Sequence, residues 1–419
     1  MSINFVFFWA VPIGGMGSIY KYGLRRFLFP VYQKYFESSP LFKQFAHTYI
    51  YTKSEYTLYF PMVVLLLFNT LISLSLMFYI QFTYGYLPPY VIFLYYCSWV
   101  GLGGRVMGGA YTMAHKEGHN HTLYKKWIRQ YVGNVFENHI GVLFGNVPYN
   151  FSTSHVFIHH KLDGGPGDTF YLWDLDRTNW TEFMIYITRI FKHMIGYSSL
   201  RLFHHMNQRT KYNTLLQGMV IYWTIALVLW GMTQSFSFVF WIYIQPLFCM
   251  SYFLALLNYG FHGFLEFDEQ GLNIPVVDAT TIIHGDDDYF GEDDHMTHHY
   301  NSTIFYTNLP QYHQSKIPEF RKYKASVFKE CSILEVSIFI VFNLWDELAK
   351  HYVDYTNSMS VEEIKVLLKD RCQRKQIPYE RYIQYEVYPT MEARKVLLTD
   401  IQTYVRLERE GNPGKGKSE

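Results

Sequence analysis

The sequence has 419 residues, of which 49% are apolar and 20% are aromatic, and its 36 basic and 35 acidic residues leave a net charge of +1. Nucleic-acid-binding proteins usually carry a strong basic excess, and this chain has neither that excess nor a basic stretch. The mean hydropathy is −0.05, so the many apolar residues must be concentrated in parts of the chain. Their distribution, rather than the length, therefore decides the class of protein.

Residues 1–56 mix aromatic and basic side chains, a composition typical of a segment that lies at a membrane interface. The first residues show neither the basic start nor the small-residue cleavage site of a signal peptide. Because the chain starts at Met1, we expect that no presequence has been removed. The sequence does not distinguish the endoplasmic reticulum from the mitochondrial inner membrane.

Two long stretches, 56–104 and 212–265, contain no Asp, Glu, Lys or Arg. A membrane-spanning helix needs about 20 apolar residues, so each stretch can form two such helices joined by a turn. Breaks are predicted at Pro88 and Pro89, which cannot continue a helix, and at 231–236. Helices buried in a soluble protein rarely avoid charge over such lengths, because one face meets water. We therefore predict four spans in two hairpins, which lie near 57–80, 90–112, 213–232 and 237–258.

The loops between the predicted spans differ in charge. Both hairpin turns lack Lys and Arg, whereas the connection 105–211 carries twelve of them. The positive-inside bias places the N-terminus, this connection and the C-terminal region on the cytosolic or matrix side. The predicted fold class is therefore an all-α, multi-pass integral membrane protein, with four transmembrane helices in two hairpins and a helical cap on that side.

The predicted membrane domain covers 57–330, and 331–419 form a C-terminal region. Residues 331–348 are apolar at most positions but are interrupted by acidic residues, which indicates a helix docked on the protein rather than a span. The four cysteines are scattered and show no metal or redox spacing, so we expect them to be reduced and structural.

The end of the chain has the pattern of a soluble helical region. Ser360 and Glu363 form a capping-box pattern at its start, and 411–419 have the composition of a flexible tail. We expect 358–410 to bind a protein partner through an amphipathic helical face. Packing of that face on the membrane domain is the alternative.

Eight histidines fall into three short clusters, each predicted on the cytosolic or matrix side. The clusters are His115 and His119; His155, His159 and His160; and His295, His298 and His299. Residues three or four apart share one face of a helix, so each cluster can direct at least two imidazoles toward one point. A ninth candidate, His262, follows the fourth predicted span directly.

This number of clustered histidines indicates a metal site, because isolated histidines rarely recur at such spacing. Neutral imidazole suits Fe, Zn, Cu and Ni, and eight or nine ligands exceed the coordination sphere of one ion, so two metal ions are implied. The pattern of zinc proteases fails, since Lys116 follows His115 and Gly118 precedes His119. A hydrolytic base beside the ligands is therefore not evident.

The three clusters, in the order HxxxH, HxxxHH and HxxHH on a two-hairpin scaffold, resemble the histidine boxes of the membrane fatty acid desaturase and hydroxylase superfamily. That superfamily includes acyl desaturases, alkane hydroxylases and carotenoid ketolases. The resemblance covers about residues 57–310, and the three boxes together make it specific. It implies that the eight clustered histidines bind metal, and His262 matches the additional histidine that the family places before the last box.

The resemblance also implies a non-haem di-iron centre, with two Fe ions and O2 as co-substrate, that removes hydrogen from a methylene of a lipid acyl chain. No catalytic residue beyond the metal centre and no further cofactor-binding residue is predicted. The chain lacks the His-Pro-Gly-Gly haem motif of a fused cytochrome b5 domain. Its electron donor is therefore expected to be a separate protein, cytochrome b5-like or ferredoxin-like. The other expected partners are the lipid acyl substrate and membrane lipids, with no nucleic acid.

Three functions stay open at this point. An O2-dependent fatty acid desaturase is favoured, a lipid or alkane hydroxylase is the second reading, and a desaturase-derived subunit of a larger membrane protein complex is the third. The second box has a spacing that several branches of the superfamily share, so it does not decide among them.

Three further segments carry expectations. We expect at least one acidic residue near the third box to accept a hydrogen bond from a ligand histidine, the alternative being a solvated acidic loop. These residues are Asp286, Asp287, Asp288, Glu292, Asp293 and Asp294. The 164–168 segment is predicted to form a tight turn, with headgroup binding as the alternative. The glycines of 101–109 are expected to let the second span pack closely on a neighbour, and Arg105 to extend toward the interface.

Overall fold

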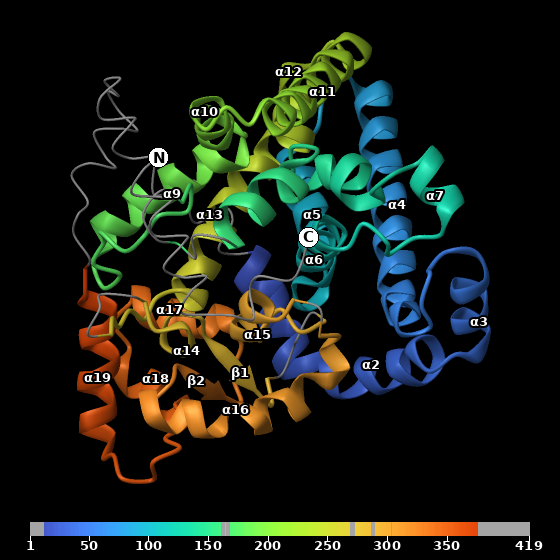
Figure 1. Ribbon diagram of the computed structural model, residues 1–419. Coiled ribbons are helices and arrows are strands. Elements are labelled where there is room, and N and C mark those ends of the chain that lie inside the picture. The colour runs from blue at the N-terminus through green and yellow to red at the C-terminus, as the bar shows by residue number, and fades with distance from the viewer. Residues whose placement is uncertain are drawn as a thin grey trace. The chain divides into compact units, whose positions relative to one another are not determined.

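The computed structural model describes residues 12–160, 164, 168–268, 273–285, 290–302 and 304–375. Helices dominate these residues, in agreement with the predicted helical class (Figure 1). One short parallel sheet was not predicted, and it pairs β1 (Thr281–Ile283) with β2 (Val327–Lys329). The chain divides into one unit of residues 1–153 and 213–250 and a second unit of residues 154–212 and 251–419.

In the first unit, short helices form the described part of the predicted interfacial arm. Ser39 caps α3 by accepting a hydrogen bond from the Phe42 N–H, and Pro40 occupies the first helical position, where its missing N–H costs nothing. The elements are η1 (Ile19–Leu24), α2 (Arg25–Tyr32), η2 (Gln33–Glu37) and α3 (Pro40–Tyr49). Their exposed apolar side chains include Tyr22, Phe27 and Leu41. An apolar exposed surface of this kind agrees with the composition expected at a membrane interface.

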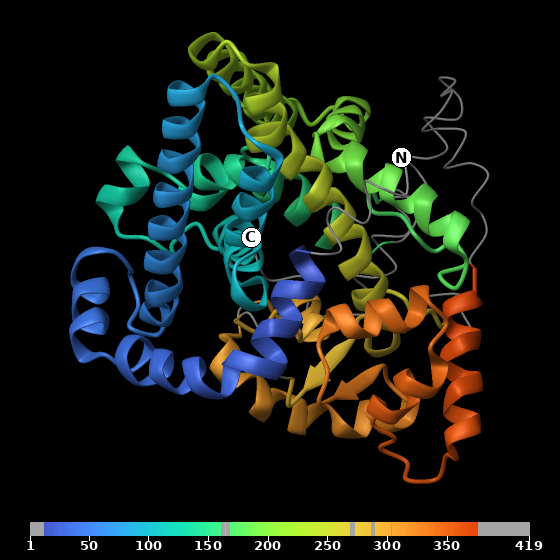
Figure 2. The ribbon, with the colours of Figure 1, turned by 180° about the vertical axis from the view of Figure 1, so that it is seen from behind.

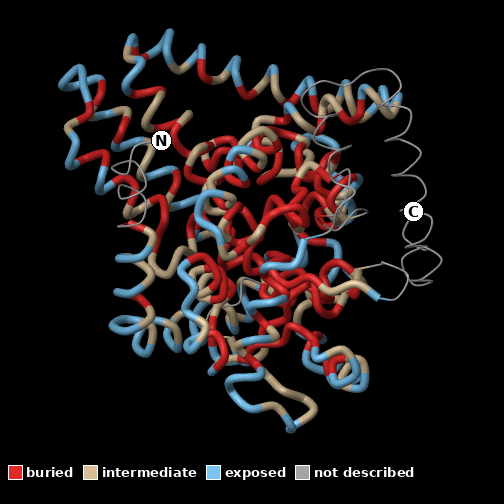
Figure 3. Tube along the Cα trace, turned by 90° about the vertical axis from the view of Figure 1, so that its left-hand side faces the viewer, coloured by how far each residue is buried: buried red, intermediate tan, exposed pale blue. Residues whose placement is uncertain are grey.

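The first predicted span is a continuous helix. A turn of 3-10 helix, η3 (Glu55–Tyr59), leads into α4 (Phe60–Tyr84), and together they form an apolar stretch of 30 residues. The helix ends at Gly85, whose φ of 77° is the left-handed conformation that favours glycine at a helix C-terminus. Only eight of the 25 α4 residues are buried, as expected for a helix that faces lipid (burial is coloured in Figure 3).

The second predicted span, near 90–112, is not one continuous helix. α5 (Pro89–Val100) is 12 residues long, or about 18 Å, whereas the hydrocarbon layer is about 30 Å thick. The chain then turns through η4 (Leu102–Gly104) into α6 (Arg105–His119). Gly101, Gly103 and Gly104 have φ values of 74°, 66° and 74°, so these glycines interrupt the helix. The second span is therefore interrupted, but the expected close packing is present at Gly109, where an added Cβ would lie 3.1 Å from Met62 Sδ of α4.

The third and fourth predicted spans are present as long apolar helices. α11 (Arg209–Thr233) has 25 residues, and α12 (Phe236–Val239), η8 (Phe240–Ile244) and α13 (Gln245–Phe261) follow one another over 26 residues. Ser235 caps α12 through its hydroxyl, which accepts from the Phe238 N–H at 3.2 Å. Among the described residues, three helices are therefore long and apolar enough to cross a membrane, rather than the four predicted.

The rest of the first unit is made of short helices, α7 (Lys126–Tyr131), η5 (Phe136–Ile140) and η6 (Gly141–Phe144). Of these, η5 and η6 pack against α6. The indole of Trp99 in α5 donates to the Leu143 carbonyl at 3.1 Å, and the Tyr96 hydroxyl donates to the Trp241 carbonyl. These hydrogen bonds connect α5 to η6 and η8.

The second unit holds the elements that carry most of the clustered histidines. η7 (Phe151–His159) leads into it, and α9 (Trp180–Met194) and α10 (Tyr197–His205) follow. Gly196, with φ of 82°, separates these two helices. The remaining elements before the C-terminal region are α14 (Pro275–Asp278), α15 (His295–Tyr300), η9 (Tyr306–Asn308) and α16 (Leu309–Tyr323).

The C-terminal region begins with two helices where one was expected. α17 (Ile333–Val341) and α18 (Trp345–His351) are separated at Asn343, which adopts φ of 57°. The predicted capping box of α19 (Val361–Gln373) is confirmed, since Ser360 and Glu363 exchange hydrogen bonds. Arg371 and Cys372 of α19 are buried, so this helix packs on its own unit, which was the alternative to partner binding (Figure 2). The tail and the rest of 358–410 lie outside the described residues.

The four cysteines agree with the prediction. Each is a free thiol, and Cys249, Cys331 and Cys372 are buried.

Candidate metal centre

Four histidines of the second unit form a buried group. His159 ends η7, His262 follows α13 directly, and His295 and His299 occupy one face of α15. Each offers one ring nitrogen, and these nitrogens all lie within 4.8 Å of one another. None of the four side chains exposes more than 6% of its surface. Helical spacing explains the pair on α15, while the fold brings the other two to it.

The facing atoms in this group are Nε2 nitrogens. His262 Nε2 lies 2.7 Å from His295 Nε2, which in turn lies 2.9 Å from His299 Nε2. A neutral imidazole carries a single N–H, so three nitrogens that converge in this way form the arrangement that a shared metal ion requires. The group has the donor chemistry of a metal site.

Two aspartates fix which nitrogen of the ring faces inward. His159 Nδ1 is 2.9 Å from Asp168 Oδ2, and His262 Nδ1 is 3.1 Å from Asp278 Oδ2. A carboxylate that accepts the Nδ1–H leaves Nε2 as the ligand atom and raises its basicity. Both aspartates are buried, so their negative charge also offsets that of a bound cation.

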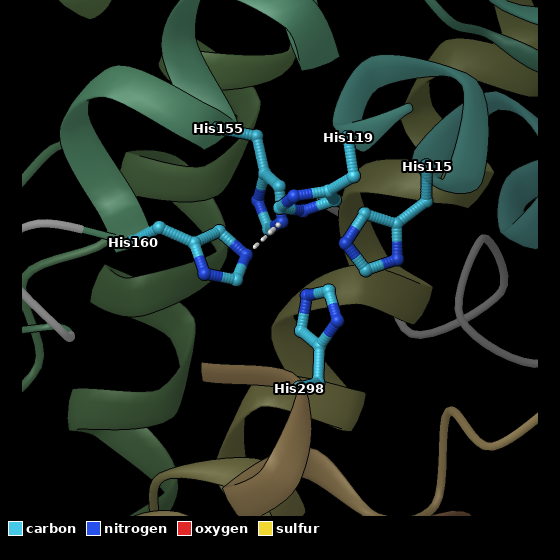
Figure 4. A group of neighbouring side chains, drawn as sticks. All are labelled: His115, His119, His155, His160 and His298. Atoms are coloured by element: carbon cyan, nitrogen blue, oxygen red, sulfur yellow. Dashed lines mark hydrogen bonds between the residues drawn. The ribbon is translucent and has the colours of Figure 1, made fainter. Parts of the chain in front are cut away.

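A second set of histidines comes from the same unit. His160 Nε2 lies 3.0 Å from His155 Nε2, and the rings of His160 and His298 have centroids 4.5 Å apart. In Figure 4 these three side chains point toward one another. His298 stands one residue before His299 on α15, so α15 presents ligands to both sets.

The remaining two predicted ligands, His115 and His119, belong to the first unit. They lie one turn apart on α6 with ring centroids 4.9 Å apart, and Figure 4 draws them with the second set. Helical spacing places both on one face, as predicted.

A family model described as fatty acid desaturase matches residues 92–330, which is more than half of the chain. The chain belongs to the fatty acid desaturase family. The resemblance noted in the sequence is thus confirmed, and the matched desaturase region contains all nine histidines of the predicted site. No curated protein and no solved structure matches the chain.

Glu117 anchors the first histidine box of the desaturase region. Its Oε2 accepts hydrogen bonds from the N–H groups of Phe136 and Glu137, both at 2.8 Å, and its Oε1 accepts from the Tyr124 hydroxyl at 2.5 Å. Burial raises the pKa of Glu117 to about 8, while these donors act in the opposite direction. The carboxyl between His115 and His119 is therefore engaged in holding α6 to η5, and it does not project as a free base.

Asp294 supports the third box as a helix cap. It accepts the Thr297 N–H at 3.1 Å, and its other oxygen pairs with His313 Nε2. Asp168 and Asp278, which lie outside the expected acidic cluster, pair with ligand histidines. Asp286, Asp287 and Asp288 lie outside the described residues.

Asp168 and Asp278 were missed because neither has a local sequence signal. Asp168 ends the predicted tight turn, of which 165–167 lie outside the described residues. Its Oδ2 accepts the Gly164 N–H at 2.8 Å and its Oδ1 accepts the Phe170 N–H at 2.8 Å. The same carboxylate thus binds Gly164 and orients His159. Asp278 ends α14 and reaches His262 only through the fold.

His193 is buried like the clustered histidines, but its ring pairs with hydroxyl groups. Its Nδ1 lies 2.9 Å from the Thr169 hydroxyl and 3.2 Å from that of Ser199. Burial lowers its pKa to about 3, so it is neutral at physiological pH. It is a buried structural histidine.

Proposed function

We propose that this chain is a membrane oxidoreductase that uses two Fe ions, O2 and external electrons to desaturate a lipid acyl chain. The observation that carries the proposal is the group of four buried histidines, His159, His262, His295 and His299, inside the desaturase-family region. A pair of iron ions supplies O2 activation and removal of hydrogen from an unactivated methylene, which is chemistry that no side chain provides.

The proposed ligands divide into two groups. His159, His262, His295 and His299 would hold one ion; His115, His119, His155, His160 and His298 would hold the other. The donor set supports this assignment, because it consists of neutral imidazoles, which suit iron. Hydrolytic zinc chemistry is disfavoured, because the carboxylate of Glu117 is held by three donors of the protein itself.

The remaining residues of the site bind, orient and exclude water. Asp168 and Asp278 hold the ring orientation of His159 and His262, and burial of all four side chains keeps water from the ligand atoms. Electrons would come from a separate cytochrome b5-like or ferredoxin-like protein, and the acyl substrate from the surrounding lipid. A subunit role in a larger membrane protein complex would leave the same histidines in place.

We propose that the turn at Gly85 and the turn at Ser235 lie on the opposite side of the membrane from the histidines. Three of the four apolar helices that flank these turns are long enough to cross a membrane, α5 is apolar but shorter, and the turns carry no Lys or Arg. A single cysteine introduced at either turn, in a cysteine-free background, should react with an impermeant maleimide only from the far side. A cysteine at Thr122 should react only from the histidine side, and reaction of all three from one side would contradict this topology.

The function is tested by comparing lipids from cells that lack the chain with lipids from cells that express it or its His295→Ala variant. Loss of one unsaturated acyl species in both the deletion and the variant is the expected result. Both reactions begin with the same hydrogen removal, so only the product distinguishes them. Loss of a hydroxylated species instead would identify the hydroxylase alternative. An unchanged lipid profile together with an unstable membrane complex would identify the subunit role and contradict the enzymatic proposal.

A further inference from the structure

Two buried arginines connect α19 to the chain segment that follows His262. Arg177 and Arg371 expose 0% and 1% of their surface, and both belong to the second unit. Fully buried arginines are rare unless their N–H donors are satisfied. The groups that accept these hydrogen bonds therefore show which chain segments each arginine connects.

Arg177 donates to four backbone carbonyls rather than to one carboxylate. Its Nη1 donates to Leu175 at 2.5 Å and to Arg374 at 2.8 Å, and its Nη2 donates to Arg371 at 2.6 Å. Its Nε donates to the carbonyl of Gly263, the residue after His262, at 3.1 Å. Two of these carbonyls end α19, where the helix dipole favours a positive charge. One guanidinium thus joins the end of α19 to the His262 segment.

Arg371 makes the second connection to the same segment. Its Nε lies 2.8 Å from Glu266 Oε2, and its guanidinium also donates to the carbonyls of Tyr323 and Lys324 at 2.8 and 2.6 Å. Its own carbonyl accepts the Leu265 N–H at 3.2 Å. In Figures 1 and 2 the C-terminal end of α19 lies beside the chain that leads into α9. Gly263, Leu265 and Glu266 are therefore all tied to α19 or to Arg177.

The hydrogen bonds of Arg177 and Arg371 affect His262 because α13 ends at the residue before it, Phe261. The backbone of His262 is therefore held by α13 on one side and by the segment 263–266 on the other. Asp278 orients the imidazole ring but does not hold this segment. Burial lowers the pKa of Arg177 from its ordinary value.

We propose that Arg177 and Arg371 are positioning residues of the metal centre, and that α19 holds His262 in ligand position through them. The proposal rests on the function proposed above, because it assigns His262 to a metal ion. α19 is thereby an integral part of the desaturase centre rather than an appendage of it.

The test compares the full-length variants Arg371→Gln and Arg371→Lys with Lys365→Gln. Lys365 is the matched control, since it lies on the same helix and pairs only with the exposed carboxylates of Asp346 and Glu362. After a fixed challenge with an iron chelator, Arg371→Gln should keep about one iron per chain and the control about two. The expected loss in affinity at the His262 group is about 10- to 100-fold, the range for residues that support metal ligands. The iron content of Arg371→Lys should lie between those of Arg371→Gln and the control, because lysine keeps the positive charge but lacks the planar guanidinium.

A double variant separates positioning from general instability. If Arg371 acts through His262, the variant with both Arg371→Gln and His262→Ala should keep the same single iron as His262→Ala alone. Loss of both ions in Arg371→Gln would show that α19 holds the whole fold and would overturn the proposal. Retention of both ions in Arg371→Gln would overturn it as well.

Amide hydrogen exchange of the metal-free protein gives a readout that does not depend on iron. The peptide covering 262–266 should exchange at least about tenfold faster in Arg371→Gln than in Lys365→Gln, because the Leu265 N–H loses a fixed acceptor. Equal exchange would overturn the positioning role. If the wild-type chain binds no metal while 262–266 still exchange faster in Arg371→Gln than in Lys365→Gln, the proposed function is overturned. The attachment of this segment to α19 is then established on its own.

Discussion

Replacing His262 by Ala should lower the iron content from about two ions per chain to about one. His262 contributes one of four nitrogens that lie within 4.8 Å of one another, and its Nε2 is 2.7 Å from that of His295. A three-histidine remnant keeps a ligand set, but the cavity left by the ring admits water and the Asp278 carboxylate loses its imidazole partner. Metal analysis of the purified, lipid-embedded protein measures the change, and lipid desaturation should fall with it.

Two further variants serve as comparisons for His262→Ala. His193→Ala removes an equally buried histidine that pairs with hydroxyls, so it should keep about two ions even if it lowers stability. Asp278→Asn keeps the ligand but weakens the hydrogen bond that orients it, so we expect an affinity loss of about 10- to 100-fold at that ion. Equal iron in His262→Ala and His193→Ala would show that His262 is an ordinary core histidine.

The histidine boxes could be predicted because their geometry is local. Positions three or four apart meet on one face of a helix whatever the rest of the chain does, as His115 and His119 on α6 and His295 and His299 on α15 show. His262 was predicted from its place at the end of a span and from the family resemblance. The carboxylates of Asp168 and Asp278 depend on contacts between elements, and no spacing rule encodes those contacts.

The spans were predicted for a similar reason, and the one error has an identifiable cause. Long charge-free stretches need only composition to be recognised, and three of the four spans predicted within them are long apolar helices. At 101–104 the composition stays apolar while the backbone changes, because glycine adopts positive φ readily. A side chain at Gly101 would place its Cβ 2.5 Å from Val106 Cγ2, so the break also depends on a close contact. Hydropathy does not register either effect.

The support of the metal ligands lies largely outside the histidine boxes. Asp168 and Asp278 orient two of the rings, Arg177 and Arg371 hold the segment after His262, and Asp294 caps the helix of the third box. Each of these groups is charged and buried, or nearly so, and each is satisfied by backbone groups or by a histidine. A substitution that removes one partner therefore leaves an unpaired buried group, which costs more than the lost contact itself.

Glu117→Ala should be the most destabilising single substitution in the first unit outside the histidines. The carboxyl accepts hydrogen bonds from the Phe136 and Glu137 N–H groups and from the Tyr124 hydroxyl, and its side chain is fully buried. Truncation leaves these three donors unsatisfied, and each buried donor left in this way costs about 1–3 kcal/mol. Allowing for partial relaxation, we expect a loss of about 3 kcal/mol in the free energy of unfolding.

Thermal unfolding of the metal-free protein in detergent should show this loss as a fall in Tm of several degrees. Glu117→Gln keeps an oxygen that can accept from both backbone N–H groups, so its Tm should lie between those of Glu117→Ala and the wild type. Glu55→Ala is the control, because Glu55 is only partly buried and its 3.5 Å contact with Lys53 is a surface ion pair of little energetic consequence. If Glu117→Ala and Glu55→Ala unfold at the same temperature, the three hydrogen bonds do not hold α6 to η5, and the first histidine box must be fixed by packing alone.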